Sequence, residues 1–107
     1  MSDTNIVILE GRIAKDPTSK ELQSGVVVCN FSIAISPGKA ITYLNCKVFG
    51  TKATELALNG KTGDTISLKG SIQTRKWEEK YYTEIVVDHF HLTAKTVKEV
   101  SSEFIAE

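Results

Sequence analysis

The sequence predicts an all-β fold, a five-stranded Greek-key barrel with one short helix between the third and fourth strands. Apolar and polar residues alternate with a period of two in five stretches that are rich in β-branched residues. One stretch between the third and fourth of these has the composition of a helix instead. The chain has 107 residues, of which 41% are hydrophobic, so it can form one small core.

The strand predictions follow the alternation and end at turn residues. The turns are expected at Asp16-Pro17, Ser24-Gly25, 36–38, 60–64 and 78–80, where Gly, Pro, Asp, Ser or charged residues gather. The predicted strands are Asn5–Ala14, Val26–Ser36, Ile41–Phe49, Thr65–Lys76 and Tyr81–Leu92.

The helix prediction covers Thr51–Asn59, TKATELALN, which is rich in Ala, Leu and Glu. Thr51 or Thr54 is placed to cap its start, and Gly60 ends it. This order of elements is that of the OB-fold, a small barrel whose exposed face commonly binds oligonucleotides. Residues 1–93 are therefore expected to form the domain, and residues 94–107 a short, polar, flexible tail.

Charge is balanced overall but divided unevenly along the chain. The formal net charge is zero, which is unusual for a nucleic-acid-binding domain. Between Arg12 and Lys76, however, there are ten basic and four acidic residues. Such segregation is what a one-sided surface for a polyanion needs, although a solvated surface can also show it.

Cysteine content and hydropathy indicate the cellular compartment of the protein. Cys29 and Cys46 each lie within an apolar strand pattern, so both are interpreted as buried free thiols in a reducing cytosol. The longest apolar runs are only a few residues, and we expect no membrane association. The sequence thus predicts a cytoplasmic protein.

Alternation assigns two faces to the third and fourth strands. On the third strand, Leu44, Cys46 and Val48 are expected to face the core. On the fourth, the expected core set is Ile66, Leu68, Ile72 and Thr74. The opposite, outward faces then carry Tyr43, Asn45, Lys47 and Phe49 on the third strand and Lys69, Ser71, Gln73, Arg75 and Trp77 on the fourth.

Aromatic and basic side chains on one surface suit a single-stranded nucleic acid. Every base has a π-face to stack on, which contributes about 1–3 kcal/mol per base whatever its identity. Cations along the same surface pair with phosphates. Each residue also has a structural alternative: Trp77 as a hairpin plug, Phe49 as packing beneath the helix, Tyr43 as a cross-strand partner, and the cations as solvated charges. Their coincidence on one face favours binding.

The chain resembles the bacterial and phage single-stranded DNA-binding protein family over Asn5–Leu92. The matching stretches are NIVILEGRIAKDP, SGVVVCNFSIAIS, YLNCKVFG, GDTISLKGSIQTRKW and YYTEIVVD, in the order and spacing of the family. The resemblance implies that Tyr43, Phe49 and Trp77 stack on bases and that Arg75 and Lys76 contact phosphates. It also implies a homo-oligomer, usually a tetramer, with a dimer as the alternative, in which Ile6–Glu10 pairs between subunits.

Two departures from the family are apparent. The connection Ser36–Ala40 is short and offers only Lys39, where many members have a longer hairpin with another aromatic. The residues SSEFIAE are only a faint echo of the family's long tail with an acidic tip, and no such tail is expected. A smaller DNA footprint is expected from the first departure, and the second leaves docking of replication or recombination proteins open.

The sequence therefore predicts sequence-independent binding and protection of single-stranded DNA during replication, recombination and repair. The alternative is a primosomal-type OB-fold adaptor whose main role is to contact replication proteins. No enzyme activity, cofactor or metal is expected, because His89 and His91 lack a further ligand at a recognisable spacing. The predicted nucleic-acid-binding residues are Arg12, Lys39, Tyr43, Lys47, Phe49, Lys69, Gln73, Arg75, Lys76 and Trp77.

Overall fold

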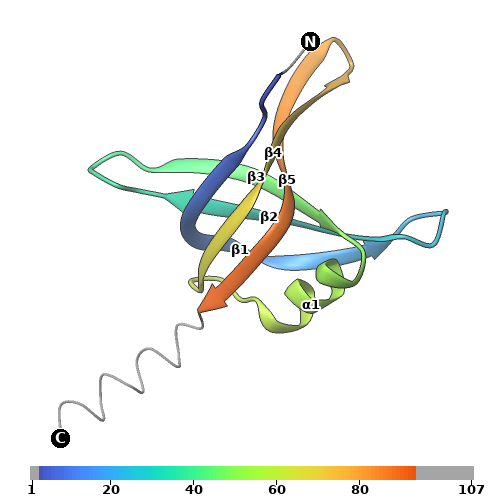
Figure 1. Cartoon of the computed structure of the whole chain (residues 1–107), viewed down its shortest axis with the longest axis horizontal. Helices are drawn as coiled ribbons and strands as arrows, with labels where there is room; N and C mark the ends of the chain where they lie inside the picture. The colour runs from blue at the N-terminus through green and yellow to red at the C-terminus, as the bar shows by residue number, and fades with distance from the viewer. Residues whose placement is uncertain (1–2, 94–107) are drawn as a thin grey trace, which may run out of the picture.

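The computed structural model describes residues 3–93 as a closed barrel with one helix at its end (Figure 1). Around the barrel the strands follow the order β1-β2-β3-β5-β4, and β4 pairs with β1 to close it. The elements are β1 (Val7–Glu21), β2 (Val27–Ile35), β3 (Thr42–Phe49), α1 (Thr51–Asn59), β4 (Thr65–Trp77) and β5 (Lys80–Thr93). The predicted fold class is confirmed, and the tail expected at 94–107 lies outside the described residues.

The core consists of the inward residues of all five strands together with one face of α1. Residues in it include Ile13, Ile33, Cys46 and Ile66, each at most 2% exposed. Leu56 of α1 is fully buried and closes the end of the barrel next to β1, β2 and β3. The inward set predicted on β3 is confirmed, because Cys46 and Val48 are buried and Leu44 is partly buried.

Strand β1 is longer than predicted and passes through the expected turn at Asp16-Pro17. Its pairing with β2 shifts register between Ile13 and Lys15 and again between Lys15 and Thr18. Pro17 lies within the second irregularity, where its missing N–H removes no ladder hydrogen bond. The prediction of a turn there was wrong, because the bulges bend the strand around the barrel without ending it.

The fourth strand differs from prediction in which residues it buries. Ile66 and Leu68 are buried as expected, but Ile72 is 45% exposed and Thr74 is exposed. The pairing of β1 with β4 ends at Gly70, and beyond it β4 and β5 continue as a hairpin that projects from the barrel (Figure 1). The inward assignment of Ile72 and Thr74 was therefore wrong, since no barrel interior lies beneath that part of the strand.

Two glycines shape the connections around the barrel. Gly50 precedes α1 with a φ of 82°, a conformation that a side chain disfavours. The predicted capping role of Thr51 or Thr54 was wrong, because no side chain hydrogen bonds to the helix start. Gly70 sits at a register shift of β4 against β5, where an added Cβ would collide with the carbonyl oxygen of Val86.

Within residues 3–93, the nine-residue α1 has neither the length nor the apolar content of a membrane span.

Candidate nucleic-acid interface

The outward residues of β1, β2 and β3, apart from the buried Val28, form one continuous polar and aromatic surface, called here the three-strand face. Antiparallel pairing sets these residues in cross-strand rows. The two outermost rows each combine one cation of β1 with one aromatic ring of β3. From one edge to the other the rows are Arg12–Ala34–Tyr43, Lys15–Ser32–Asn45, Thr18–Asn30–Lys47 and Lys20–Val28–Phe49.

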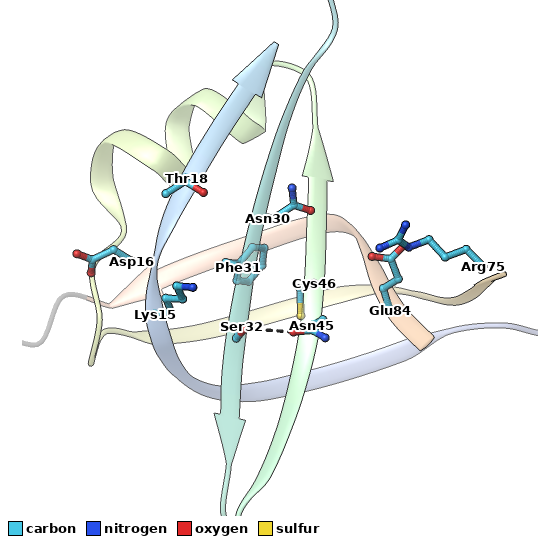
Figure 2. Close-up of a pocket in the computed structure, with 10 residues that line it drawn as sticks. All are labelled: Lys15, Asp16, Thr18, Asn30, Phe31, Ser32, Asn45, Cys46, Arg75 and Glu84. Atoms are coloured by element: carbon cyan, nitrogen blue, oxygen red, sulfur yellow. Dashed lines mark hydrogen bonds and ion pairs between the residues drawn. The ribbon is translucent and has the colours of Figure 1, made fainter. Parts of the chain in front are cut away.

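A hollow of about 280 Å³ opens on the three-strand face (Figure 2). Asn30, Ser32 and Asn45 line its centre, and the Ser32 hydroxyl lies 3.2 Å from Oδ1 of Asn45, to which it donates. Lys15 borders it from β1, whereas Arg75 and Glu84 border it from the β4–β5 hairpin. The hairpin and the three-strand face therefore share one concave surface.

An ion-pair cluster ties the hairpin to β3 at the edge of this hollow. Oε1 of Glu84 lies 2.7 Å from Nζ of Lys47 and 3.2 Å from Nε of Arg75. Glu84 is only 9% exposed, and the Lys47 side chain only 19%. The carboxylate thus holds two cations from different strands against each other in a partly desolvated place, where such contacts are stronger than at an open surface.

Aromatic rings lie near three cations of β3 and the β4–β5 hairpin. Lys47 lies 6.0 Å from the ring centre of Phe49, and Arg75 lies 5.7 Å from that of Tyr82. Towards the hairpin tip, Lys76 lies 5.8 Å from the ring centre of Tyr81. These are cation–π distances, so the rings help to fix where the charges stand.

Most predicted site residues gather on this concave surface. Tyr43, Lys47, Phe49 and Arg12 lie on the three-strand face, and Arg75 reaches it through Glu84. Gln73 and Trp77 lie along the exposed β4–β5 hairpin on the same face of β4 as Arg75, whereas Lys76 lies on the opposite face of the hairpin.

Two further predicted residues stand apart from that surface. Lys39 is exposed on the connection between β2 and β3, which projects from the barrel (Figure 1). Lys69 has Ile8 of β1 and His89 of β5 as its cross-strand neighbours, so residues of the hollow do not flank it.

Sequence reasoning missed part of the surface. It named neither the hairpin rings Tyr81 and Tyr82 nor the carboxylate of Glu84. A signal for the two tyrosines was present, because a two-residue turn after Trp77 sets Arg75 opposite Tyr82 and Lys76 opposite Tyr81. The further missed residues that line the hollow or the face are Lys15, Lys20, Asn30, Ser32 and Asn45.

Other polar groups near the hollow have structural partners. Oδ1 of Asp16 accepts hydrogen bonds from the Thr62 hydroxyl at 2.6 Å and from the Thr62 amide at 2.7 Å. These bonds lower the pKa of Asp16 and anchor the bulged part of β1 to the loop after α1.

Burial or a neighbouring side chain accounts for the remaining candidate groups. Burial raises the pKa of Cys46 to about 12, so this thiol lining the hollow stays protonated. Nδ1 of His89 lies 2.9 Å from Nζ of Lys52. Among residues 3–93, no group of three or more His, Cys, Asp or Glu side chains is arranged to hold a metal ion.

The turn of the β4–β5 hairpin is strained, and relieving it is expected to stabilise the protein. Glu78 and Glu79 have φ values of 47° and 68°, a left-handed conformation that Asn and Gly adopt more readily. Replacing them by Asn and Gly should raise the free energy of unfolding by about 1 kcal/mol in chemical denaturation. The control changes both to Gln, which removes the same charges and keeps the strain. Equal stabilisation of the two variants would assign the effect to charge.

Comparison with known proteins agrees with this fold. Residues 4–93 match the model of the single-strand binding protein family. A single-stranded DNA-binding protein of Oceanobacillus iheyensis is 33% identical over 96 residues, which are 78% of this chain and 60% of that protein. Single-stranded DNA-binding protein 3 of Streptococcus agalactiae is 31% identical over 100 residues, 82% of this chain and 72% of that protein.

A solved structure shares the fold over most of the chain. The SSB domain of a Synechococcus protein superposes with a TM-score of 0.73 at 22% identity, covering 85% of this chain and 98% of that domain. The chain spans 60% of the Oceanobacillus relative and 53% of another from Enterococcus faecalis. On the match over residues 4–93 and these identities, the chain belongs to the single-strand binding protein family.

Proposed function

We propose that the protein binds single-stranded DNA without sequence preference and protects it during replication, recombination and repair. The observation that carries the proposal is the exposure of three aromatic rings on β3 and β4, the strands that carry Lys47 and Arg75. Tyr43, Phe49 and Trp77 are 66%, 43% and 59% exposed. Rings left in water on a folded domain favour a partner that covers them, and nucleobases do so without regard to identity.

Two kinds of contact make up the proposed mechanism. Phe49 and Trp77 are the main stacking platforms, and Tyr43 is a third. Lys47, Arg75 and Lys76 contact phosphates, with Arg12 and Lys39 further along the strand. The names of the relatives as single-stranded DNA-binding proteins support single-stranded DNA as the ligand. Binding, and not catalysis, is then the activity of the chain, in line with the family to which it belongs.

The proposed assembly is a homo-oligomer, with a tetramer as the expected form. Ile6, just before β1, and Ile8, near the start of that strand, are 59% and 77% exposed, although both are aliphatic. Covering them in a second copy would remove this apolar surface from water. We place the protein in the cytoplasm of a bacterial cell or a phage-infected host, where Cys29 and Cys46 stay reduced. Sedimentation with and without oligo(dT) measures both assembly and stoichiometry.

The single tryptophan provides a direct test of DNA binding. Adding oligo(dT) at low salt is expected to change Trp77 emission and to retard the oligonucleotide in a gel. With three phosphate contacts, the logarithm of the association constant should fall against that of salt with a slope of about −2. Unchanged emission together with no gel shift would refute the proposal. Nuclease-resistant complexes with replication proteins would then favour the adaptor function.

A further inference from the structure

Glu84 is an unexpected side chain for a surface that binds a polyanion. It borders the hollow of the three-strand face and is 9% exposed. Asp16, the other acidic residue that lines this hollow, is engaged by Thr62. Glu84 instead directs its carboxylate at two cations of the proposed DNA contact, Lys47 and Arg75.

The geometry concentrates both cations on one oxygen. Lys47 of β3 and Arg75 of β4 both contact Oε1 of Glu84, which comes from β5 (Figure 2 shows the Arg75 and Glu84 side chains). The recorded contact of Arg75 uses Nε, whereas a guanidinium has five N–H donors in all. The Tyr82 ring is a second neighbour of the guanidinium, with its centre 5.7 Å from the central guanidinium carbon, which is a cation–π distance.

A phosphate oxygen forms the same kinds of contact as this carboxylate oxygen. Both are anionic acceptors, and both form short charge-assisted hydrogen bonds with ammonium and guanidinium groups. In the free protein the carboxylate reduces the local charge of the pair of cations by one unit. A DNA phosphate arriving between Lys47 and Arg75 therefore meets a position that an anion of the protein already occupies.

We propose that Glu84 is an internal counter-anion that competes with a DNA phosphate for Lys47 and Arg75. The proposal rests on the single-stranded DNA binding proposed above. In the free protein Glu84 holds the two cations together and spares the partly buried Lys47 from being unpaired. On binding, a phosphate takes over the contacts, and the carboxylate limits both the affinity and the number of counterions released. As a result, the bound DNA is held by the protein and still exchanges readily.

The decisive variant is Glu84→Gln, which keeps the size of the side chain and removes its charge. At about 50 mM salt it is expected to bind oligo(dT) about fivefold to tenfold more tightly than the wild type, because one more cation is available. For the same reason, the slope of the logarithm of its association constant against that of the salt concentration should be steeper by about 0.7. The gain in affinity should vanish towards 1 M salt. Glu55→Gln is the matched control, since it also removes one negative charge, but at an exposed position of α1.

A second variant keeps the proposal testable if Glu84→Gln does not fold. The double variant Lys47→Met, Glu84→Gln replaces the partly buried pair by neutral side chains of similar length, a change that folded proteins often tolerate. Arg75 is then free of its competitor, and the local charge equals that of the wild type. The double variant should bind oligo(dT) about fivefold to tenfold more tightly than the single variant Lys47→Met, in which Glu84 still pairs with Arg75.

The outcomes separate this proposal from the proposed function. A wild-type protein that does not bind oligo(dT) refutes the function itself. If the wild type binds and Glu84→Gln binds equally or more weakly than Glu55→Gln, Glu84 is no competitor and this proposal alone is overturned. A double variant that binds no more tightly than Lys47→Met overturns it too, because Arg75 would then gain nothing from the loss of the Glu84 charge.

Discussion

Removing both main stacking rings, in the double variant Phe49→Ala, Trp77→Ala, is expected to weaken oligo(dT) binding by about 2–6 kcal/mol. Each ring contributes about 1–3 kcal/mol by stacking, and the two contributions should add if the rings stack on different bases. Both rings are largely exposed, at 43% and 59%, so the fold should survive their removal. Because the variant lacks tryptophan, binding is measured by fluorescence anisotropy of a labelled oligonucleotide.

Leu58→Ala is the control for this experiment. Leu58 is 74% exposed on α1, so the substitution removes an apolar side chain of similar exposure from a different part of the surface. Its affinity for oligo(dT) should equal that of the wild type. Unchanged affinity of the double variant would show that neither ring contributes to binding by stacking on bases. Loss of cooperative unfolding in that variant would instead show that the rings stabilise the barrel.

Leu56→Ala is expected to lower the free energy of unfolding by about 2–5 kcal/mol. Leu56 is fully buried, and α1 packs against β1, β2 and β3. A Cβ placed at Gly60 would touch both Leu56 and Ile13, which shows how closely these side chains meet. The truncation leaves a cavity at the end of the barrel that such tight neighbours fill only in part.

Chemical denaturation measures this effect, and Leu58→Ala is again the control. The control lies on the exposed side of the same helix, so its stability should change by no more than about 0.5 kcal/mol. Folded Leu56→Ala protein should bind oligo(dT) like the wild type, because Leu56 does not line the hollow. A loss of stability that is equally small in both variants would mean that α1 is dispensable for closing the barrel.

Much of the fold could be predicted from local pattern. The five strands and the helix were all found, and the helix bounds Thr51–Asn59 agree with the structure. The two faces of β3 were also assigned correctly, with Cys46 and Val48 buried and Tyr43 and Phe49 exposed. These features depend on the period of two in a strand and on the composition of a helix. Both signals lie entirely within a short stretch of sequence.

The candidate site could be predicted only in part. Alternation places Lys47 and Phe49 on one face, and the two-residue turn after Trp77 sets the partners of Arg75. The meeting of Lys47 with Glu84 depends instead on the short parallel contact between β3 and β5, where Cys46 pairs with Ile85 and Lys47 with Val86. A parallel contact between strands distant in the chain leaves no turn or spacing signal in the sequence.

The sequence by itself determined which residues form strands, which form the helix, and which side chains share a face of a strand. Only the tertiary structure decided whether a given face is covered. Ile72 has the same alternation as Leu68, yet it is exposed because β4 leaves the barrel after Gly70. Likewise β1 continues past Pro17 because bulges there fit it to the closing sheet. Periodicity is a property of neighbouring residues, whereas burial and charge pairing depend on how distant strands close the barrel.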